Sequence, residues 1–245
     1  MTLMEHLIEL RRRIIITCIA VGLAAIVGWF LYPTVFRFLL HPYRQIASKS
    51  IAGGDLIVTS PLEGFAIRLK LTAYVAIALA MPVILWQIWQ FVSPGLYKHE
   101  RRYALPFIFS SIALFIMGAY IAYWTLPKAL EWLANIGGSD ITQAYTADKY
   151  FQLIAYMMLA FGIGFEFPIL LIFLQIAGIV SNETLRKYWR HAIVVVAIVV
   201  AVATPSNDPF SMLALCIPLW VFYGVAVLFG MVRNRRRRRA AAKTG

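Results

Sequence analysis

The sequence predicts an all-α polytopic membrane protein with six transmembrane helices, and composition and segment length together lead to this fold class. Apolar residues make up 61% of the 245 residues, above the roughly 45–50% of soluble domains. Charged residues contribute only 14%. Apolar runs, most of them long enough to cross a hydrocarbon core of about 30 Å as helices, occupy residues 14–36, 71–92, 103–126, 151–176, 192–203 and 210–232.

Lysine and arginine are distributed unevenly between the two sides of this arrangement. Sixteen of the 23 lie in the N-terminal segment, the second and fourth loops and the C-terminal tail. The other seven are spread over longer loops on the opposite side. Because cytoplasmic loops are enriched in basic residues, both termini are expected in the cytoplasm. The net charge of +12 therefore reflects topology, and we expect the arginine-rich tail to bind anionic lipid and not nucleic acid.

We expect a single transmembrane domain, residues 1–232, followed by a disordered basic cytoplasmic tail, residues 233–245. The first 13 residues end in three arginines and precede an apolar run long enough to span, so no cleavable signal is predicted. Cys18 and Cys216 lie inside apolar runs and indicate neither a disulfide nor a metal site. No cofactor is predicted.

The last two apolar runs are unusual. Residues 192–203 form a run of only 12 residues, about 18 Å of helix, whereas the sixth run is long enough to span but contains Pro218. The turn between them is rich in Pro, Asn and Asp, and its Asp208 is able to cap the sixth helix. The pair either crosses a locally thinned bilayer, which we favour, or forms a hairpin that stops short of the far face.

Prolines are expected to interrupt or end four of the predicted helices. Pro82 and Pro168 lie inside the second and fourth runs, and Pro33 and Pro127 lie at the ends of the first and third. Each removes a backbone donor and frees a carbonyl one turn earlier, which must find a partner within the bundle.

The two long loops on the outer side are expected to be ordered. In the first, Ser60-Pro-Leu-Glu63 is a start signal for the second helix. In the second, the segment from Lys128 to Leu133 precedes a glycine-rich turn and indicates a short interfacial helix. Neither loop carries a catalytic motif.

Glu166 is the one carboxylate in the fourth run, a stretch of about 26 residues with no other ionic side chain. It lies within one turn of the middle of that run. A carboxylate at this depth costs a few kcal/mol or more, so it is expected to face the bundle interior, a wet cavity or a polar partner. Both a functional acid and a protonated, hydrogen-bonded packing residue satisfy this expectation.

Three glutamates lie on the basic cytoplasmic side, namely Glu5, Glu9 and Glu100. In a helix, Glu5 and Glu9 share a face. A purely structural interpretation pairs Glu9 with Arg13 and places Glu100 at the positive N-terminal end of the third helix. The alternative is an acidic patch, ringed by bases, that receives a cationic partner.

Five short motifs occur along the chain: His6-Leu-Ile-Glu-Leu-Arg-Arg-Arg13, Pro82-Val-Ile-Leu-Trp-Gln, Leu96-Tyr-Lys-His-Glu-Arg-Arg102, Phe165-Glu-Phe-Pro168 and Thr204-Pro-Ser-Asn-Asp-Pro-Phe-Ser211. In this order they resemble the TatC family, the multispanning receptor subunits of the twin-arginine protein translocase. Any one motif is weak evidence, but five in order on a six-helix plan are specific. The resemblance extends from Glu5 to about Phe229, nearly the whole chain.

The resemblance implies a receptor for the twin-arginine signal peptides of folded cargo proteins, with Glu9 and Glu100 matching the acids that hold the arginine pair. It also implies a core subunit of a translocase in the bacterial cytoplasmic (inner) membrane, driven by the proton-motive force. The apolar stretch of the peptide is then expected in a groove between helices.

The same resemblance implies roles for two further acids. Glu166 matches a buried glutamate that contacts single-span partner subunits, so a hetero-oligomer is expected. Asp208 matches an acid at the outer tip of the last hairpin, where we expect it to order the turn. Many relatives carry Gln where this chain has Met212, so Glu166 depends more on a partner chain, water or protonation.

A proton-coupled small-molecule transporter that uses Glu166 is the alternative function from a different class. It would explain an intramembrane acid and broken helices, but it predicts several polar groups converging at mid-depth, where Glu166 is the only acid. An enzyme is not expected, because the sequence contains no HExxH, no Gly-x-Ser-x-Gly and no phosphate-binding loop. Gly162-Ile-Gly164 is interpreted as a helix-packing motif.

Overall fold

The computed structural model describes residues 3–50, 56–92, 104–136, 145–176, 178, 180–204 and 208–244. Within these ranges the chain is helical apart from short connections, and one isolated β-bridge joins Ile57 to Thr146. The helices are α1 (Leu3–Ser50), α2 (Glu63–Val92), α3 (Ala104–Ile136), α4 (Ala147–Gly164), α5 (Phe167–Ile176), α6 (Asn182–Lys187), α7 (Trp189–Ala203) and α8 (Pro209–Thr244).

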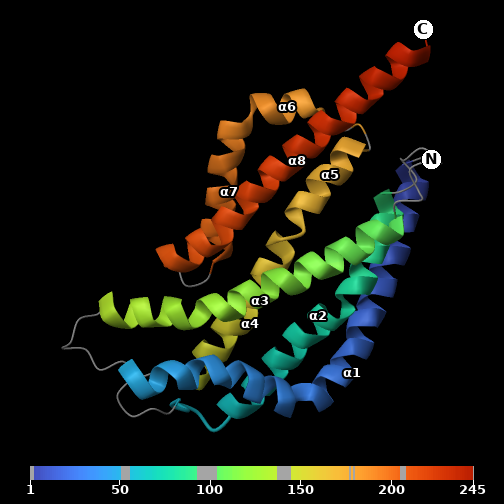
Figure 1. Ribbon diagram of the computed structural model, residues 1–245. Coiled ribbons are helices and arrows are strands. Elements are labelled where there is room, and N and C mark those ends of the chain that lie inside the picture. The colour runs from blue at the N-terminus through green and yellow to red at the C-terminus, as the bar shows by residue number, and fades with distance from the viewer. Residues whose placement is uncertain are drawn as a thin grey trace.

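Five segments of the described chain are long and apolar enough to cross a membrane, and α7 is a shorter apolar helix. Each of the six predicted runs coincides with one of these segments, and α4 and α5 together form the fourth. Both termini lie at one end of the bundle, the upper end in Figure 1, as an even number of crossings requires. We call this the terminal end and the opposite end the loop end. The predicted all-α membrane fold is confirmed.

α1 passes through two prolines without ending, so the prediction that Pro33 ends the first helix is wrong. The helix bends sharply instead (Figure 1). Pro33 leaves the carbonyl of Trp29 without its usual helical donor, and Nη2 of Arg68 in α2 donates to that carbonyl at 3.5 Å. The same guanidinium lies 4.0 Å from the centre of the Trp29 ring. A donor from a neighbouring helix therefore replaces the lost one.

The second proline of α1 is accommodated in the same way. Pro42 frees the carbonyl of Phe38, which accepts a hydrogen bond of 3.1 Å from the hydroxyl of Tyr123 in α3. The rings of Phe38 and Tyr123 stack with their centroids 4.4 Å apart. The next carbonyl, that of Leu39, accepts from the hydroxyl of Tyr150 in α4 at 2.7 Å. The bent half of α1 is thus fastened to both α3 and α4.

α2 and α3 also continue through their prolines, so Pro82 does not interrupt a helix and Pro127 does not end one. α3 extends to Ile136, and the segment expected as a separate interfacial helix forms its last turns. The prediction that a proline interrupts the helix is correct only for the fourth run, where the helix breaks between Gly164 and Phe167. Pro168 is the second residue of α5, a first-turn position in which a proline removes no intrahelical hydrogen bond.

α2 begins at Glu63, as the start signal predicts, and this residue anchors the loop end. Its Oε2 accepts from the backbone nitrogen of Thr59 at 2.6 Å, and its Oε1 accepts from that of Asp148 at 2.9 Å. Asp148 in turn accepts from Nζ of Lys70 at 2.7 Å. One network of charged groups therefore joins the start of α2 to the start of α4.

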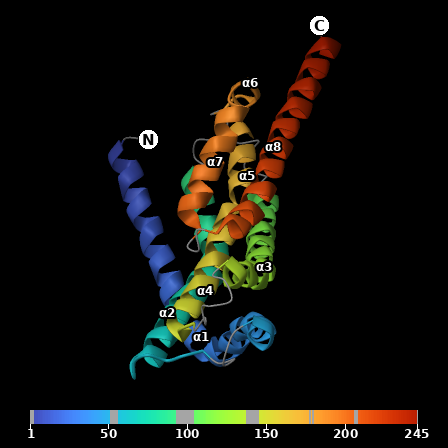
Figure 2. The ribbon, with the colours of Figure 1, turned by 90° about the vertical axis from the view of Figure 1, so that its left-hand side faces the viewer.

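The α7–α8 hairpin is short at the loop end. α7 has 15 residues, about 22 Å of helix, and begins three residues before the predicted run. The last turn of α7 and the first turn of α8 lie nearer the middle of the bundle than the loop-end parts of α1 and α4 (Figures 1 and 2). Whether the bilayer thins around this turn stays a prediction. α8 continues through the basic tail to Thr244, where we expected disorder after residue 232.

The free carbonyls at the end of α5 are capped from α8. Nη1 of Arg233 donates to the carbonyl of Gln175 at 2.7 Å, and Nη2 donates to that of Ile176 at 3.3 Å. The buried side-chain amide of Gln175 donates to the carbonyl of Ala226 at 3.0 Å. A basic side chain at a helix C-terminus satisfies unpaired carbonyls and favours the negative end of the helix dipole. These bonds hold α5 against α8.

α4 is the central helix and packs against α1, α2, α3 and α8. It approaches α3 closely because glycines stand at the contact. A Cβ placed on Gly118 of α3 would lie 2.6 Å from the carbonyl oxygen of Phe161, and one on Gly162 would lie 2.6 Å from the ring of Phe115. The helix-packing interpretation of Gly162 therefore holds.

We predict that Gly118→Ala lowers the free energy of unfolding by about 1–3 kcal/mol, because the new methyl group meets backbone atoms that cannot turn aside. Gly22→Ala is the matched control, since a Cβ at Gly22 meets nothing within 4 Å. Unfolding of both variants in detergent, followed by circular dichroism, measures the difference. Equal stability of the two variants would contradict the close contact between α3 and α4.

Candidate functional site

The candidate acids at the terminal end are only partly positioned by the structure. Glu100 falls in residues 93–103, which lie outside the described residues, so its proximity to Glu9 stays a prediction. Glu9 is in α1, two turns after the helix begins, and its side chain is 19% exposed. The acid is therefore largely sheltered, although it lies near the end of the bundle.

Glu9 belongs to a polar cluster between α1 and α2. Its Oε1 accepts from Nη2 of Arg13 one turn later, which is the ion pair that the structural interpretation predicts. Nη1 of Arg13 donates to Oε1 of Gln90 at 2.7 Å and to Oε1 of Gln87 at 3.3 Å. Beside this cluster, the rings of His6 and Phe91 stack at 4.3 Å. The cluster therefore fastens the first turns of α1 to the last turns of α2.

Glu166 stands in the break between α4 and α5. Its backbone nitrogen donates to the carbonyl of Ile163 at 3.0 Å, and its carbonyl accepts from the nitrogen of Leu170 at 3.0 Å. The two helices are therefore joined by one tightened turn. Around the break, Phe165 is completely enclosed, with its ring 5.3 Å from that of Phe222 in α8, whereas Glu166 and Phe167 are only partly buried.

The carboxylate of Glu166 faces α3, where Ser111 is the adjacent polar side chain. Oε1 of Glu166 and Oγ of Ser111 are both buried, and neither makes a hydrogen bond of regular geometry within the described part of the chain. Met212 packs against the core and supplies no polar group. Unsatisfied buried oxygens are costly, so this pair of side chains is suited to accept a polar group from another molecule.

Asp208 lies at the start of α8, immediately before Pro209. Its Oδ1 accepts from the backbone nitrogen of Ser211 at 2.6 Å, and its side chain is almost completely buried. This is the geometry of an N-cap, with proline at the first helical position. The described contact thus connects Asp208 with the first turn of α8, and its ordering of the preceding turn stays a prediction.

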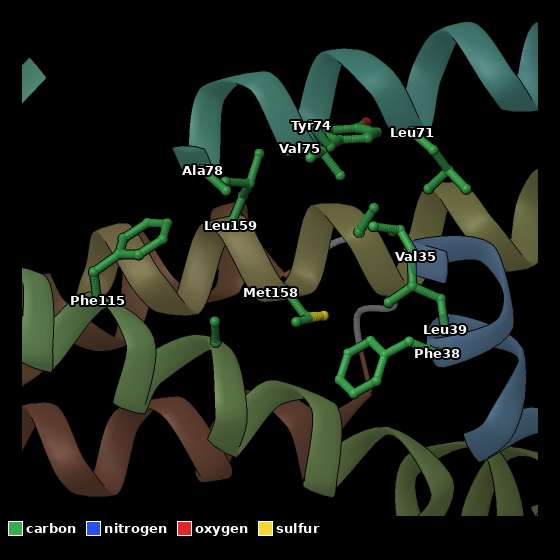
Figure 3. A pocket seen from close by; sticks show the side chains of 12 residues that line it. Val35, Phe38, Leu39, Leu71, Tyr74, Val75, Ala78, Phe115, Met158 and Leu159 are labelled. Atoms are coloured by element: carbon green, nitrogen blue, oxygen red, sulfur yellow. The ribbon is translucent and has the colours of Figure 1, made fainter. Parts of the chain in front are cut away.

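An apolar cavity of about 200 Å³ lies among α1, α2, α3 and α4 (Figure 3). Phe38 and Leu39 enter it from α1, Tyr74 from α2, Phe115 from α3 and Met158 from α4. This volume is below the range of about 300–1,000 Å³ typical of ligand sites, so it accommodates apolar side chains and not a whole helix. Among the described residues, no group of three His, Cys, Asp or Glu is placed to hold a metal ion.

Comparison with known proteins identifies the family. Residues 5–218 match the family of Sec-independent protein translocase proteins, TatC. The chain belongs to the TatC family. TatC of Frankia casuarinae is 39% identical over 96% of this chain and 67% of its own length. TatC of Helicobacter pylori strain J99 is 35% identical over 95% of this chain and 90% of its own length. TatC of Aquifex aeolicus is 35% identical over 97% of this chain and 98% of its own length.

The fold agrees with this assignment to TatC. A crystal structure of the twin-arginine translocase receptor TatC in DDM matches with a TM-score of 0.79 and 35% sequence identity. The match covers 92% of this chain and 99% of that one. The chain is therefore a multi-pass membrane protein of a Sec-independent protein translocase, and it works as a component of a translocase complex.

Sequence reasoning found the acids of this TatC protein but missed the amides beside them. Gln87 and Gln90 lie in an apolar run, where a polar side chain is costly unless it has a partner. Their spacing of three residues, which puts both on one helix face, was the available signal. Their partner is Arg13, more than 70 residues away in the sequence. This contact could be identified only from the packing of α1 on α2.

We predict that Asp208→Ala destabilises the α7–α8 hairpin by about 0.5–2 kcal/mol, because the backbone of Ser211 loses its cap. Asp208→Asn keeps an acceptor oxygen at this position and is expected to retain most of the stability. Thermal unfolding of the two variants in the same detergent compares them. Equal loss in both variants would show that the charge of Asp208, and not the cap, is required.

Proposed function

We propose that this TatC protein is a receptor for twin-arginine signal peptides and a core subunit of a translocase that exports folded proteins. The observation that carries the proposal is a sheltered carboxylate, Glu9, beside other groups that bind guanidinium at the terminal end of a TatC fold. The crystal structure that resembles this chain is itself that of a twin-arginine translocase receptor.

The chemistry of such a peptide matches the acids. Two guanidiniums at neighbouring positions suit two carboxylates, Glu9 and Glu100, because arginine forms bidentate bonds that lysine cannot copy. The basic residues around them would repel an ordinary cationic peptide that lacks this spacing. The apolar stretch that follows the arginines would then lie along a groove between helices, with the cavity of Figure 3 receiving individual side chains.

We propose that the terminal end faces the cytoplasm of a bacterial cell and that the protein lies in its inner membrane. Sixteen of the 23 Lys and Arg belong to the segments on this side, as the positive-inside rule requires for a cytoplasmic face. The basic tail at the end of α8 would lie against anionic lipid. Binding of the signal peptide would then take place on the side where proteins are made.

Glu166 is proposed as the contact with single-span partner subunits, in a hetero-oligomer whose transport is driven by the proton-motive force. Its buried oxygen and that of Ser111 have no partner within the described chain. A helix from another subunit that carries a hydroxyl or amide group would satisfy both at the break between α4 and α5. The α7–α8 hairpin is short at the loop end (Figures 1 and 2), and we propose that such a helix approaches from that side.

We predict that the lipid-reconstituted protein binds a labelled Arg-Arg signal peptide better than its Lys-Lys counterpart. Glu100→Gln should weaken binding of the Arg-Arg peptide by about 2–4 kcal/mol, as expected when one partner of a desolvated charge pair is lost. Fluorescence anisotropy measures both affinities. Glu183→Gln, which removes an exposed acid from α6, is the control. Equal affinity for the two peptides would reject the receptor proposal.

We predict that Glu166→Gln leaves affinity for the signal peptide unchanged but impairs transport, because an amide can neither ionise nor offer a polar partner two acceptor oxygens. Transport of a folded cargo into membrane vesicles that contain the partner subunits is the measurement. Glu131→Gln removes an exposed acid of α3 and should have no effect. Transport by Glu166→Gln at the wild-type rate would remove the proposed role.

A further inference from the structure

The polar cluster between α1 and α2 is a complete binding site for one guanidinium group. Three side-chain oxygens surround the guanidinium of Arg13: Oε1 of Glu9, Oε1 of Gln87 at 3.3 Å and Oε1 of Gln90 at 2.7 Å. We call Glu9, Gln87 and Gln90 the guanidinium cradle. Its members come from two helices, and the side chain of its occupant is only 16% exposed.

The composition of the cradle is unusual for a packing contact. Two amides in an apolar run cost more than aliphatic side chains would, unless a buried polar group requires them. A lone ion pair between Glu9 and Arg13, four residues apart on one helix, would need no residue from α2. The two glutamines therefore make the cradle a site suited to guanidinium, whose five donors in a rigid planar fork reach acceptors on two helices, whereas an ammonium is a compact point charge with three donors.

Arg13 uses this site incompletely. Its Nε and Oε2 of Glu9 are both buried, and neither has a hydrogen-bond partner among the described residues. The contact between them is thus single, whereas a guanidinium that approaches a carboxylate side-on forms two parallel bonds. Because Arg13 reaches Glu9 from the same helix, the backbone restricts its approach. An arginine from a separate, extended peptide is free of that restriction.

We propose that Arg13 is an internal substitute for an arginine of the signal peptide and leaves the cradle when the peptide binds. This inference rests on the proposed receptor function and adds Gln87 and Gln90 to the peptide-binding residues. The chain's own arginine keeps the buried carboxylate of Glu9 paired in the empty receptor. It also sets a threshold, since only a side chain that binds all three oxygens better than Arg13 displaces it.

The test compares affinity for the labelled Arg-Arg peptide between the wild-type protein and Arg13→Gln, both in lipid nanodiscs. Gln at position 13 keeps a neutral donor for Glu9 but no longer competes as a cation. We expect Arg13→Gln to bind about tenfold more tightly, since about 1.4 kcal/mol of competition corresponds to that factor. Arg12→Gln removes the same charge from an exposed neighbour and should have little effect.

A second comparison tests the glutamines. In the Arg13→Gln background, where no internal arginine competes, Gln87→Leu with Gln90→Leu should reverse the gain in affinity. Arg13→Lys provides a further check in case Arg13→Gln folds poorly. Lysine keeps the positive charge but lacks the planar set of guanidinium donors. The affinity of Arg13→Lys for the Arg-Arg peptide should therefore fall between the wild-type and Arg13→Gln values. Size-exclusion chromatography and thermal unfolding confirm that each variant is folded.

Three results would overturn the inference. The first is that folded Arg13→Gln binds the peptide no more tightly than Arg12→Gln. The second is that Arg13→Lys binds it no more tightly than the wild type. Either result would show that Arg13 does not compete with the peptide. An undiminished affinity after loss of both glutamines would show that the cradle does not receive the peptide. Each of these leaves the receptor function intact if the wild-type protein still prefers Arg-Arg to Lys-Lys. Absence of that preference would instead reject the receptor function, and the inference with it.

Discussion

Backbone carbonyls that prolines free inside the bundle need donors from the protein, because the hydrocarbon core provides no water. In α1, the carbonyls of Trp29 and Phe38 receive theirs from Arg68 of α2 and Tyr123 of α3. The first helix can therefore bend around its neighbours without ending, and its bent half closes the loop end of the bundle. The guanidinium of Arg68 over the Trp29 ring, and the stacked rings of Phe38 and Tyr123, add packing to these hydrogen bonds.

The fourth membrane segment follows the same constraint with a different result. Its backbone breaks before Pro168, and the turn in the break carries Glu166 into the interior opposite Ser111. α5 beyond the break is short, but Arg233 and Gln175 fasten it to α8. The intramembrane acid is thus held by a rigid frame on both sides, while its own oxygen keeps no partner within the described chain. This combination suits a contact with another subunit.

At the terminal end, one ion pair packs two helices together and also stands at the centre of the proposed peptide site. Glu9 and Arg13 form the pair that helix spacing alone predicts, which by itself favours a purely structural interpretation. The amides of Gln87 and Gln90 change this interpretation, because they extend the pair into a site with the shape and charge of a guanidinium receptor. The proposed receptor function would use such a site to bind an arginine of the signal peptide.

The sequence by itself determined the membrane class, the six apolar segments, the helix break near Glu166 and the TatC motifs, because hydropathy, length and motif order are local properties. Only the tertiary structure decided that the helices continue through Pro33, Pro82 and Pro127, because the surrounding packing determines whether a proline ends a helix or is tolerated within it. It also brought Gln87 and Gln90 to Arg13. Both outcomes depend on helices distant in sequence, whose contacts no local pattern encodes.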